Sequence, residues 1–133
     1  MTVSSKKELR SPLKASRGLG SAKDGTHHWV VQRISAIALI PLSVWFVYSL
    51  LTAIMADANA ARLFVAQPVN AILLFLLVEA MLYHGALGVQ VVIEDYVHKP
   101  CYKIALLLGV KIGTAALMVT AALAILKIAL GGA

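Results

Sequence analysis

Three long apolar runs constrain the fold of this chain more than any other feature. They extend roughly from Trp29 to Ala56, from Leu63 to Ile93 and from Tyr102 to Leu130. The hydrocarbon core of a bilayer is about 30 Å thick and takes about 20 helical residues to cross. Each run is therefore long enough to span a membrane. Because lipid offers no partner for backbone N–H and C=O groups, a spanning segment must be a helix or part of a closed barrel.

Residue patterning decides between these two structures. No segment alternates apolar and polar residues as a barrel strand would. The chain has 133 residues, of which 60% are hydrophobic and 14% charged, and its mean hydropathy is +0.85. This composition is far more apolar than that of a soluble domain. We therefore predict an all-α membrane protein, with a polar tail over residues 1–28 and a three-helix bundle over residues 29–133, and we expect no nucleic-acid partner.

Basic residues predict how the three helices are oriented. The loop between the first two runs offers only Asp57 and Arg62, whereas the second loop adds Lys99 and Lys103. The tail contains six basic residues and two acidic ones: Lys6, Lys7, Arg10, Lys14, Arg17, Lys23, Glu8 and Asp24. The positive-inside rule therefore places the N-terminus and the second loop in the cytoplasm, and the C-terminus on the periplasmic side. The result is an up-down-up bundle.

The tail and the single cysteine indicate little chemistry. The tail has no apolar core, so it is not a secretory signal peptide. Its basic, Ser-rich composition fits a bacterial juxtamembrane arm, and it also fits an organellar transit sequence. Cys101 is the only cysteine, which excludes an internal disulfide and a cysteine-rich metal site.

Several polar residues fall inside the apolar runs: Gln32, Arg33, Glu79, His84 and Lys111. Ionisable groups are costly in a bilayer and usually face a partner or a cavity, so we expect this chain to assemble with other subunits. Glu79 and Lys111 come to a similar depth if the second helix ends near Gly88 and the third begins near Lys103. A pair between them, direct or through water, is one hypothesis; a protonated Glu79 and a Lys111 paired with another subunit are the alternatives.

The second helix carries a face of small residues around a histidine. Ala80, His84 and Gly88 recur at intervals of four, with Gly85 beside them. Such a face leaves room for another backbone or a flat cofactor, and a porphyrin needs both an imidazole and open space beside it. The alternative is a histidine that hydrogen-bonds a neighbouring helix. The third helix has its own small face, a helix-packing motif, formed by Ala105, Gly109, Gly113, Ala116 and Thr120.

Reactive groups gather at the predicted cytoplasmic edge. The entry to the first helix contains His27, His28 and Arg33. The second loop contains Glu94, Asp95, Tyr96 and His98. A phenol can donate a hydrogen bond to a carbonyl, and a carboxylate or an imidazole can pass protons. Arg33 can neutralise an anionic group such as a propionate. Snorkelling of Arg33 and an ordinary interfacial position for Tyr96 are the alternatives.

These residues match a known family. Gly25, His27, Trp29 and Arg33 open the first helix, and His84 is followed by Asp95 and Tyr96 at offsets of 11 and 12. In this order the two segments resemble the hydrophobic membrane anchor of succinate dehydrogenase (respiratory complex II), in its alphaproteobacterial or mitochondrial-like form. The resemblance covers nearly everything after the tail.

The resemblance implies a role for each matched residue. His84 would be an axial ligand of the iron of haem b, with the other ligand supplied by the partner anchor. Tyr96 would hydrogen-bond a carbonyl of ubiquinone, the substrate, and Asp95 would belong to the same site. Arg33 and His27 would lie near the haem propionates and the quinone. Haem occupancy differs between family members.

The resemblance also implies partners and a location. The partners would be the cytochrome b subunit of succinate dehydrogenase, which is the second anchor, together with the iron–sulfur subunit, the flavoprotein subunit and membrane lipid. This chain has no dinucleotide-binding glycine motif and no cysteine cluster, so it holds neither the flavin nor the iron–sulfur centres. It would lie in the cell inner membrane, or in the mitochondrial inner membrane if organellar. The alternatives are a fumarate reductase anchor, a self-assembling small transporter and a purely structural anchor.

Overall fold

The computed structural model describes residues 23–54 and 57–131, and all of its regular structure is helical. The order is α2 (Lys23–Ser49), the π-helical turn η1 (Leu50–Ile54), α3 (Ala58–Ala66), α4 (Pro68–Tyr96) and α5 (Pro100–Ala129). Three helices are long and apolar enough to cross a membrane. The predicted all-α membrane class with three spans is therefore confirmed. The predicted tail lies mostly outside the described residues.

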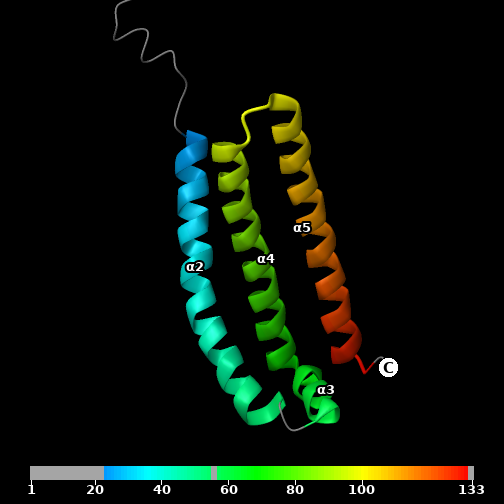
Figure 1. The fold of residues 1–133 in the computed structure, drawn as a ribbon. Coiled ribbons are helices and arrows are strands. Elements are labelled where there is room, and N and C mark those ends of the chain that lie inside the picture. Colours follow the sequence, from blue (N-terminus) through cyan, green and yellow to red (C-terminus); the bar gives the residue numbers. More distant parts are fainter. Residues whose placement is uncertain (1–22, 55–56, 132–133) are drawn as a thin grey trace, which may run out of the picture.

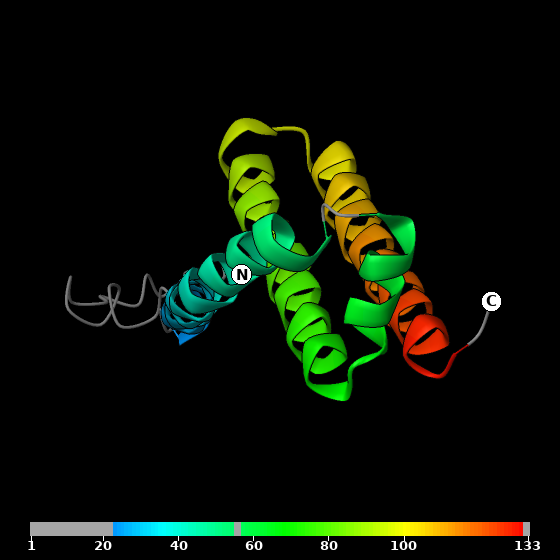
Figure 2. The ribbon, with the colours of Figure 1, turned by 90° about the horizontal axis from the view of Figure 1, so that it is seen from below.

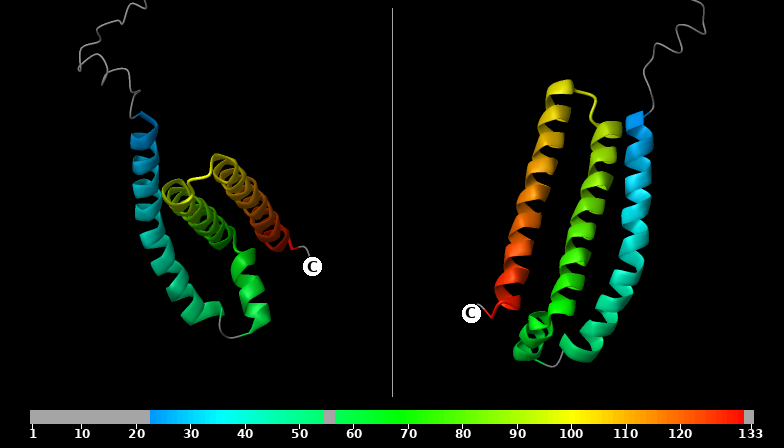
Figure 3. Two further views of the ribbon diagram at one scale, coloured as in Figure 1. Left: turned by 45° about the horizontal axis from the view of Figure 1, so that its top comes forward. Right: turned by 180° about the vertical axis from the view of Figure 1, so that it is seen from behind.

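Helix α4 lies between the other two long helices. It packs against α2 on one side and α5 on the other, whereas within the described chain the backbones of α2 and α5 do not approach each other closely. Figure 1 shows successive long helices running in opposite directions, so the start of α2, the end of α4 and the start of α5 lie at one end of the molecule. The short α3 lies at the opposite end, under α4 and α5, and Figures 2 and 3 show the same order from other sides.

The core is correspondingly small. The buried hydrophobic residues are Ala71, Leu77, Leu87 and Ile93, and all four belong to α4. Helix α5 has no buried residue. Large apolar side chains cover the outer faces of all three long helices. In a bilayer these faces contact lipid or other subunits, because either contact keeps apolar surface away from water.

Prolines and caps set the helix boundaries, which differ from those expected. Gln67 is extended and precedes Pro68, a combination that disfavours helix before the proline. The predicted helix over 63–93 is therefore divided: residues 63–66 belong to α3, and α4 begins only at Pro68. Asp57 caps α3, since its Oδ1 accepts a hydrogen bond from the Ala60 N–H at 2.6 Å. Pro100 opens α5 in the same way as Pro68 opens α4.

The ends near the predicted cytoplasmic side also extend further than expected. Helix α2 begins at Lys23 rather than near Trp29, and α4 continues to Tyr96 rather than ending near Ile93. At 1.5 Å per residue the 29 residues of α4 measure about 44 Å, more than the hydrocarbon thickness. The helix can thus continue past the apolar layer. Asp95 and Tyr96, expected in a loop, lie in its last turn.

Two irregularities shape α2. Pro41 lies inside the helix and has no N–H to donate to the preceding turn, which bends a helix. The chain then widens into the π-helical turn η1. Figure 1 shows the resulting curve of α2 toward α3. There the rings of Trp45 and Phe64 stack with centroids 5.9 Å apart, which joins α2 to α3.

Candidate functional site

His84 lies in the middle of α4 and hydrogen-bonds across to α2. Its Nδ1 is 2.9 Å from the Oγ of Ser35. The same Ser35 hydroxyl donates to the backbone carbonyl of Gln32, one turn earlier on α2, at 3.0 Å. Both the imidazole and the hydroxyl are partly buried. Hydrogen bonding to a neighbouring helix, one of the two interpretations of His84, is therefore confirmed, and it occupies one ring nitrogen only.

A cavity of about 310 Å³ lies beside this contact. It is lined by Trp29, Gln32, Arg33, Ala36 and His84, so four residues of one α2 face meet one residue of α4. Arg33 and His84, which the sequence assigned to a common neighbourhood, share this cavity. The combination of an imidazole and a guanidinium can serve a metal ion and an anionic group respectively.

Arg33 leans along its own helix. Its guanidinium carbon lies 5.4 Å from the centroid of the Trp29 ring, one turn closer to the N-terminus of α2. Helical side chains lean toward the N-terminus, and a cation over the face of an indole is favourable. The cation therefore lies toward the predicted cytoplasmic end, as the snorkelling alternative required, while still lining the cavity.

The small face around His84 is open in this chain. A side-chain carbon added at Gly85 or Gly88 would meet no atom within 4 Å. The same holds for Gly109 and Gly113 on α5, which are exposed. The small face of α5, to which these two glycines belong, was expected to pack against another helix. Within the described residues it packs against none, because α4 contacts the other side of α5.

Tyr96 and Asp95 lie apart from His84. Tyr96 ends α4 and is 78% exposed, and Asp95 is exposed as well. The twelve residues from His84 to Tyr96 correspond to about 18 Å along the helix. Neither residue lines the cavity of His84 and Arg33. His27, on the exposed surface of α2, is also outside that cavity.

The loop after Tyr96 is closed by two hydrogen bonds to the end of α4. The Nδ1 of His98 donates to the carbonyl of Tyr96 at 3.1 Å, and the Nζ of Lys103 donates to the carbonyl of Glu94 at 2.8 Å. These bonds satisfy carbonyls that a helix end leaves free. They fix the backbone next to Tyr96 and do not involve its phenol.

A second cavity, of about 360 Å³, lies where α2, α4 and α5 converge. At its edge Gln90 donates from Nε2 to Glu94 Oε1 at 2.8 Å, and the same amide lies 3.4 Å from the Nε2 of His28. Gln90, which sequence analysis did not single out, thus connects the entry of α2 to the end of α4. Tyr83, Thr114 and Lys111 also line this cavity.

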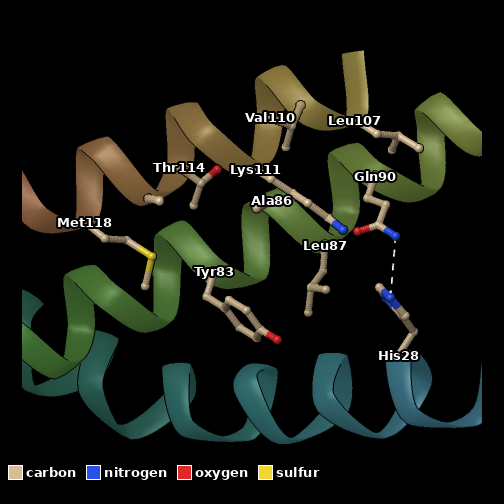
Figure 4. A pocket seen from close by; sticks show the side chains of 11 residues that line it. His28, Tyr83, Ala86, Leu87, Gln90, Leu107, Val110, Lys111, Thr114 and Met118 are labelled. Carbon is tan, nitrogen blue, oxygen red and sulfur yellow. Dashed lines mark hydrogen bonds between the residues drawn. The ribbon is translucent and has the colours of Figure 1, made fainter. Parts of the chain in front are cut away.

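Lys111 makes no direct ion pair with Glu79 in the part of the chain that the structure describes, and the Oε1 of Glu79 is buried there without a hydrogen-bond partner. Glu79 lies 17 residues before the end of α4, but Lys111 lies 11 residues after the start of α5. The helix lengths therefore place the two at different depths, about 9 Å apart. Because side chains lean toward the N-terminus of their own helix, the two side chains also lean in opposite directions on antiparallel helices. Figure 4 shows Lys111 directed toward Gln90.

A metal centre built by this chain alone is not found in the part that the structure describes. No group of three or more His, Cys, Asp or Glu side chains comes together there. His84 faces its cavity as a single imidazole. A metal site that takes one ligand from each of two subunits would need only one such imidazole from each chain.

Comparison with known proteins decides the family. A family model described as succinate dehydrogenase/fumarate reductase transmembrane subunit matches residues 7–130. The chain belongs to this family. The resemblance drawn from the His84, Asp95 and Tyr96 spacing is thus confirmed at the level of the family.

Individual relatives in this family agree. A succinate dehydrogenase hydrophobic membrane anchor subunit of Rickettsia bellii is 39% identical over 105 residues, which are 79% of this chain and 84% of the relative. The protein of the same name from Paracoccus denitrificans is 32% identical over 122 residues, 91% of this chain and 93% of the relative. Another, from Rickettsia conorii, is 40% identical over 68% of this chain and 72% of its own length. The three apolar helices of this chain and the names of these relatives fit a multi-pass protein of the inner membrane.

Proposed function

We propose that this chain is the hydrophobic membrane anchor subunit of succinate:ubiquinone oxidoreductase. In this assembly succinate is oxidised by a flavoprotein, and the electrons pass through an iron–sulfur protein. This chain and a second anchor, the cytochrome b subunit, hold that pair at the membrane. Family membership and the names of the relatives support the proposal. The apolar outer faces of the helices, α5 above all, support a need for partner subunits.

The proposal includes a haem b shared between the two anchors. The observation that carries it is the contact of His84 with Ser35, which uses Nδ1 and leaves Nε2 available, in a residue that lines the same cavity as Arg33. His84 would ligate the iron and Arg33 would neutralise a propionate. The absence of any described atom near a carbon added at Gly85 supports room for a flat ring. Haem, when bound, supplies a one-electron carrier.

Ubiquinone would bind at the same end of the molecule as Tyr96. A phenol donates a hydrogen bond to a quinone carbonyl, and Asp95 beside it can accept and release protons. Reduction of a quinone consumes two protons. A site at the membrane edge is suited to this reaction because water there can supply them. The exposure of both residues at the last turn of α4 supports this role. His27, at the start of α2, would belong to the same neighbourhood.

The proposed orientation places this end in the cytoplasm. Lys99 and Lys103 lie at the start of α5, and α2, which a basic stretch precedes in the sequence, begins at the same end of the molecule (Figure 1). The positive-inside rule therefore gives a cytoplasmic N-terminus, an up-down-up crossing and a periplasmic C-terminus. Transport by this chain alone receives no support, because Glu79, which would have to line the path with Lys111, does not line the cavity that contains Lys111.

A reduced-minus-oxidised absorption spectrum tests the proposal. The detergent-solubilised complex would be purified through a tag on this chain. We expect the flavoprotein and iron–sulfur subunits to co-purify, with a b-type haem signal that His84→Ala diminishes and Tyr96→Phe does not. Co-purification without a haem signal would refute the haem role alone. A homo-oligomer without redox subunits would refute the anchor function.

A further inference from the structure

The hydrogen bonds of Ser35 determine which nitrogen of His84 carries the proton. A hydroxyl has one hydrogen to donate, and the Gln32 carbonyl, 3.0 Å away, can only accept. The Ser35 hydrogen is therefore directed at Gln32, and a lone pair of its oxygen faces His84. Nδ1, at 2.9 Å, is then the nitrogen that donates to the Ser35 oxygen. With its one proton on Nδ1, the imidazole keeps the lone pair of Nε2 for a metal.

We propose that Ser35 is a positioning residue that holds His84 in the Nδ1–H tautomer and presents Nε2 to the haem iron. The inference rests on the proposed haem role of His84 and adds the residue that prepares it. Only a nitrogen without a proton can ligate iron, so the opposite tautomer would present an N–H to the metal. The partner of the other ring nitrogen usually sets this choice and the orientation of the ring.

The membrane makes such a partner necessary. His84 lies within a helix that spans the bilayer, where water does not satisfy a free N–H. Ser35 satisfies it from α2, the helix that also carries Arg33 and the rest of the cavity wall. The bond thus fixes the imidazole ring relative to α2, the helix whose Arg33 lines the same cavity. Ser35 touches no reacting atom; it acts through His84.

The test compares four forms of the complete purified complex: wild type, Ser35→Ala, Ser35→Thr and Ser43→Ala. Threonine keeps the hydroxyl, and Ser43 is an exposed serine on the same helix, which makes it the matched control. Two quantities are measured, the haem content per complex after repeated detergent washing and the midpoint potential of the haem.

Loss of a hydrogen-bond partner of a ligating histidine typically lowers metal affinity by about 10- to 100-fold. We expect Ser35→Ala to lose haem on washing and the haem that remains to have a higher midpoint potential, because the imidazole donates less electron density to the iron. Ser35→Thr should restore both values, and Ser43→Ala should leave both unchanged. A role of Ser35 in helix packing alone would not move the potential.

Two results would overturn the inference. Wild-type haem content and potential in Ser35→Ala would show that His84 does not need Ser35, with the haem role itself intact. A wild-type complex that contains its partners but no haem would remove the haem role and the inference together. If Ser35→Ala fails to assemble, Ser35→Cys decides by the same measurements, since a thiol has a similar shape but is a weak acceptor.

Discussion

The two roles that the sequence offered for His84 as alternatives are compatible, because its imidazole has two ring nitrogens. His84 was either a haem ligand or a histidine bonded to a neighbouring helix. The structure shows the second through Nδ1, and this bond leaves Nε2 available for the first. Ser35 could not be identified from spacing, because its importance depends on how α2 and α4 meet. It is one of several hydroxyl side chains within the first apolar run, and nothing in the sequence separates it from the others.

Tyr96 offers a direct test at the residue scale. In Tyr96→Phe we expect quinone reduction to fall up to about tenfold, since one hydrogen bond contributes about 0.5–1.5 kcal/mol. Succinate oxidation with a soluble acceptor should persist, because that chemistry belongs to other subunits. Tyr102→Phe, at another exposed tyrosine on the same side of the molecule, is the control. Equal loss of both activities in Tyr96→Phe would contradict the quinone role.

Substitutions of Glu79 and Lys111 test whether these two residues form an ion pair. Its Oε1 is buried and unpartnered, so the neutral and isosteric Glu79→Gln should assemble as well as the wild type. Glu79→Lys and Lys111→Glu should each lower the yield of complex, because a misplaced charge in a membrane helix costs about 2.5–3.5 kcal/mol on insertion scales. The double reversal should show the sum of both losses by size-exclusion chromatography of the complex. Rescue in the double variant would restore the ion-pair hypothesis.

At the scale of helices, apolar composition predicted the existence of the three spans but not their ends. Hydropathy reports where a chain meets lipid, whereas caps and prolines decide where a helix stops. The charged residues Glu94 and Asp95 suggested a loop, yet the helix continues through them beyond the apolar layer. The break between α3 and α4 follows from Gln67 and Pro68, a local signal that lies inside an otherwise continuous apolar run.

The cap of α3 can be tested on its own. Asp57→Ala removes the side chain that accepts from the Ala60 N–H, which should cost about 1 kcal/mol of local helix stability. We expect faster hydrogen exchange at the amides of residues 60–66 by mass spectrometry, with α4 unaffected. Asp57→Asn retains an accepting oxygen and should exchange like the wild type. Unchanged exchange in Asp57→Ala would mean that tertiary contacts, such as the stacking of Trp45 on Phe64, hold α3 without the cap.

At the scale of the whole molecule, a small core and large apolar outer faces belong together. Only α4 has long helices on two sides, and the buried hydrophobic residues of the described chain all belong to it. The sequence indicated this need for partners through its polar residues within the spans. It could not indicate which faces remain open, because the arrangement of α2, α4 and α5 side by side is a property of the packed bundle. The free small face of α5 is the clearest example.

The orientation of the bundle can be measured with the single native cysteine. Cys101 is exposed in the first turn of α5, at the end that the positive-inside rule places in the cytoplasm. A membrane-impermeant maleimide should therefore label it in inverted vesicles and leave it unlabelled in right-side-out ones. Leu130→Cys in a Cys101→Ser background moves the only thiol to the other end of the same helix, and it should give the reverse pattern. If Cys101 reacted from the outside and Leu130→Cys from the inside, Tyr96 and Asp95 would lie on the periplasmic face, away from soluble subunits docked in the cytoplasm, and the proposed quinone site would be wrong.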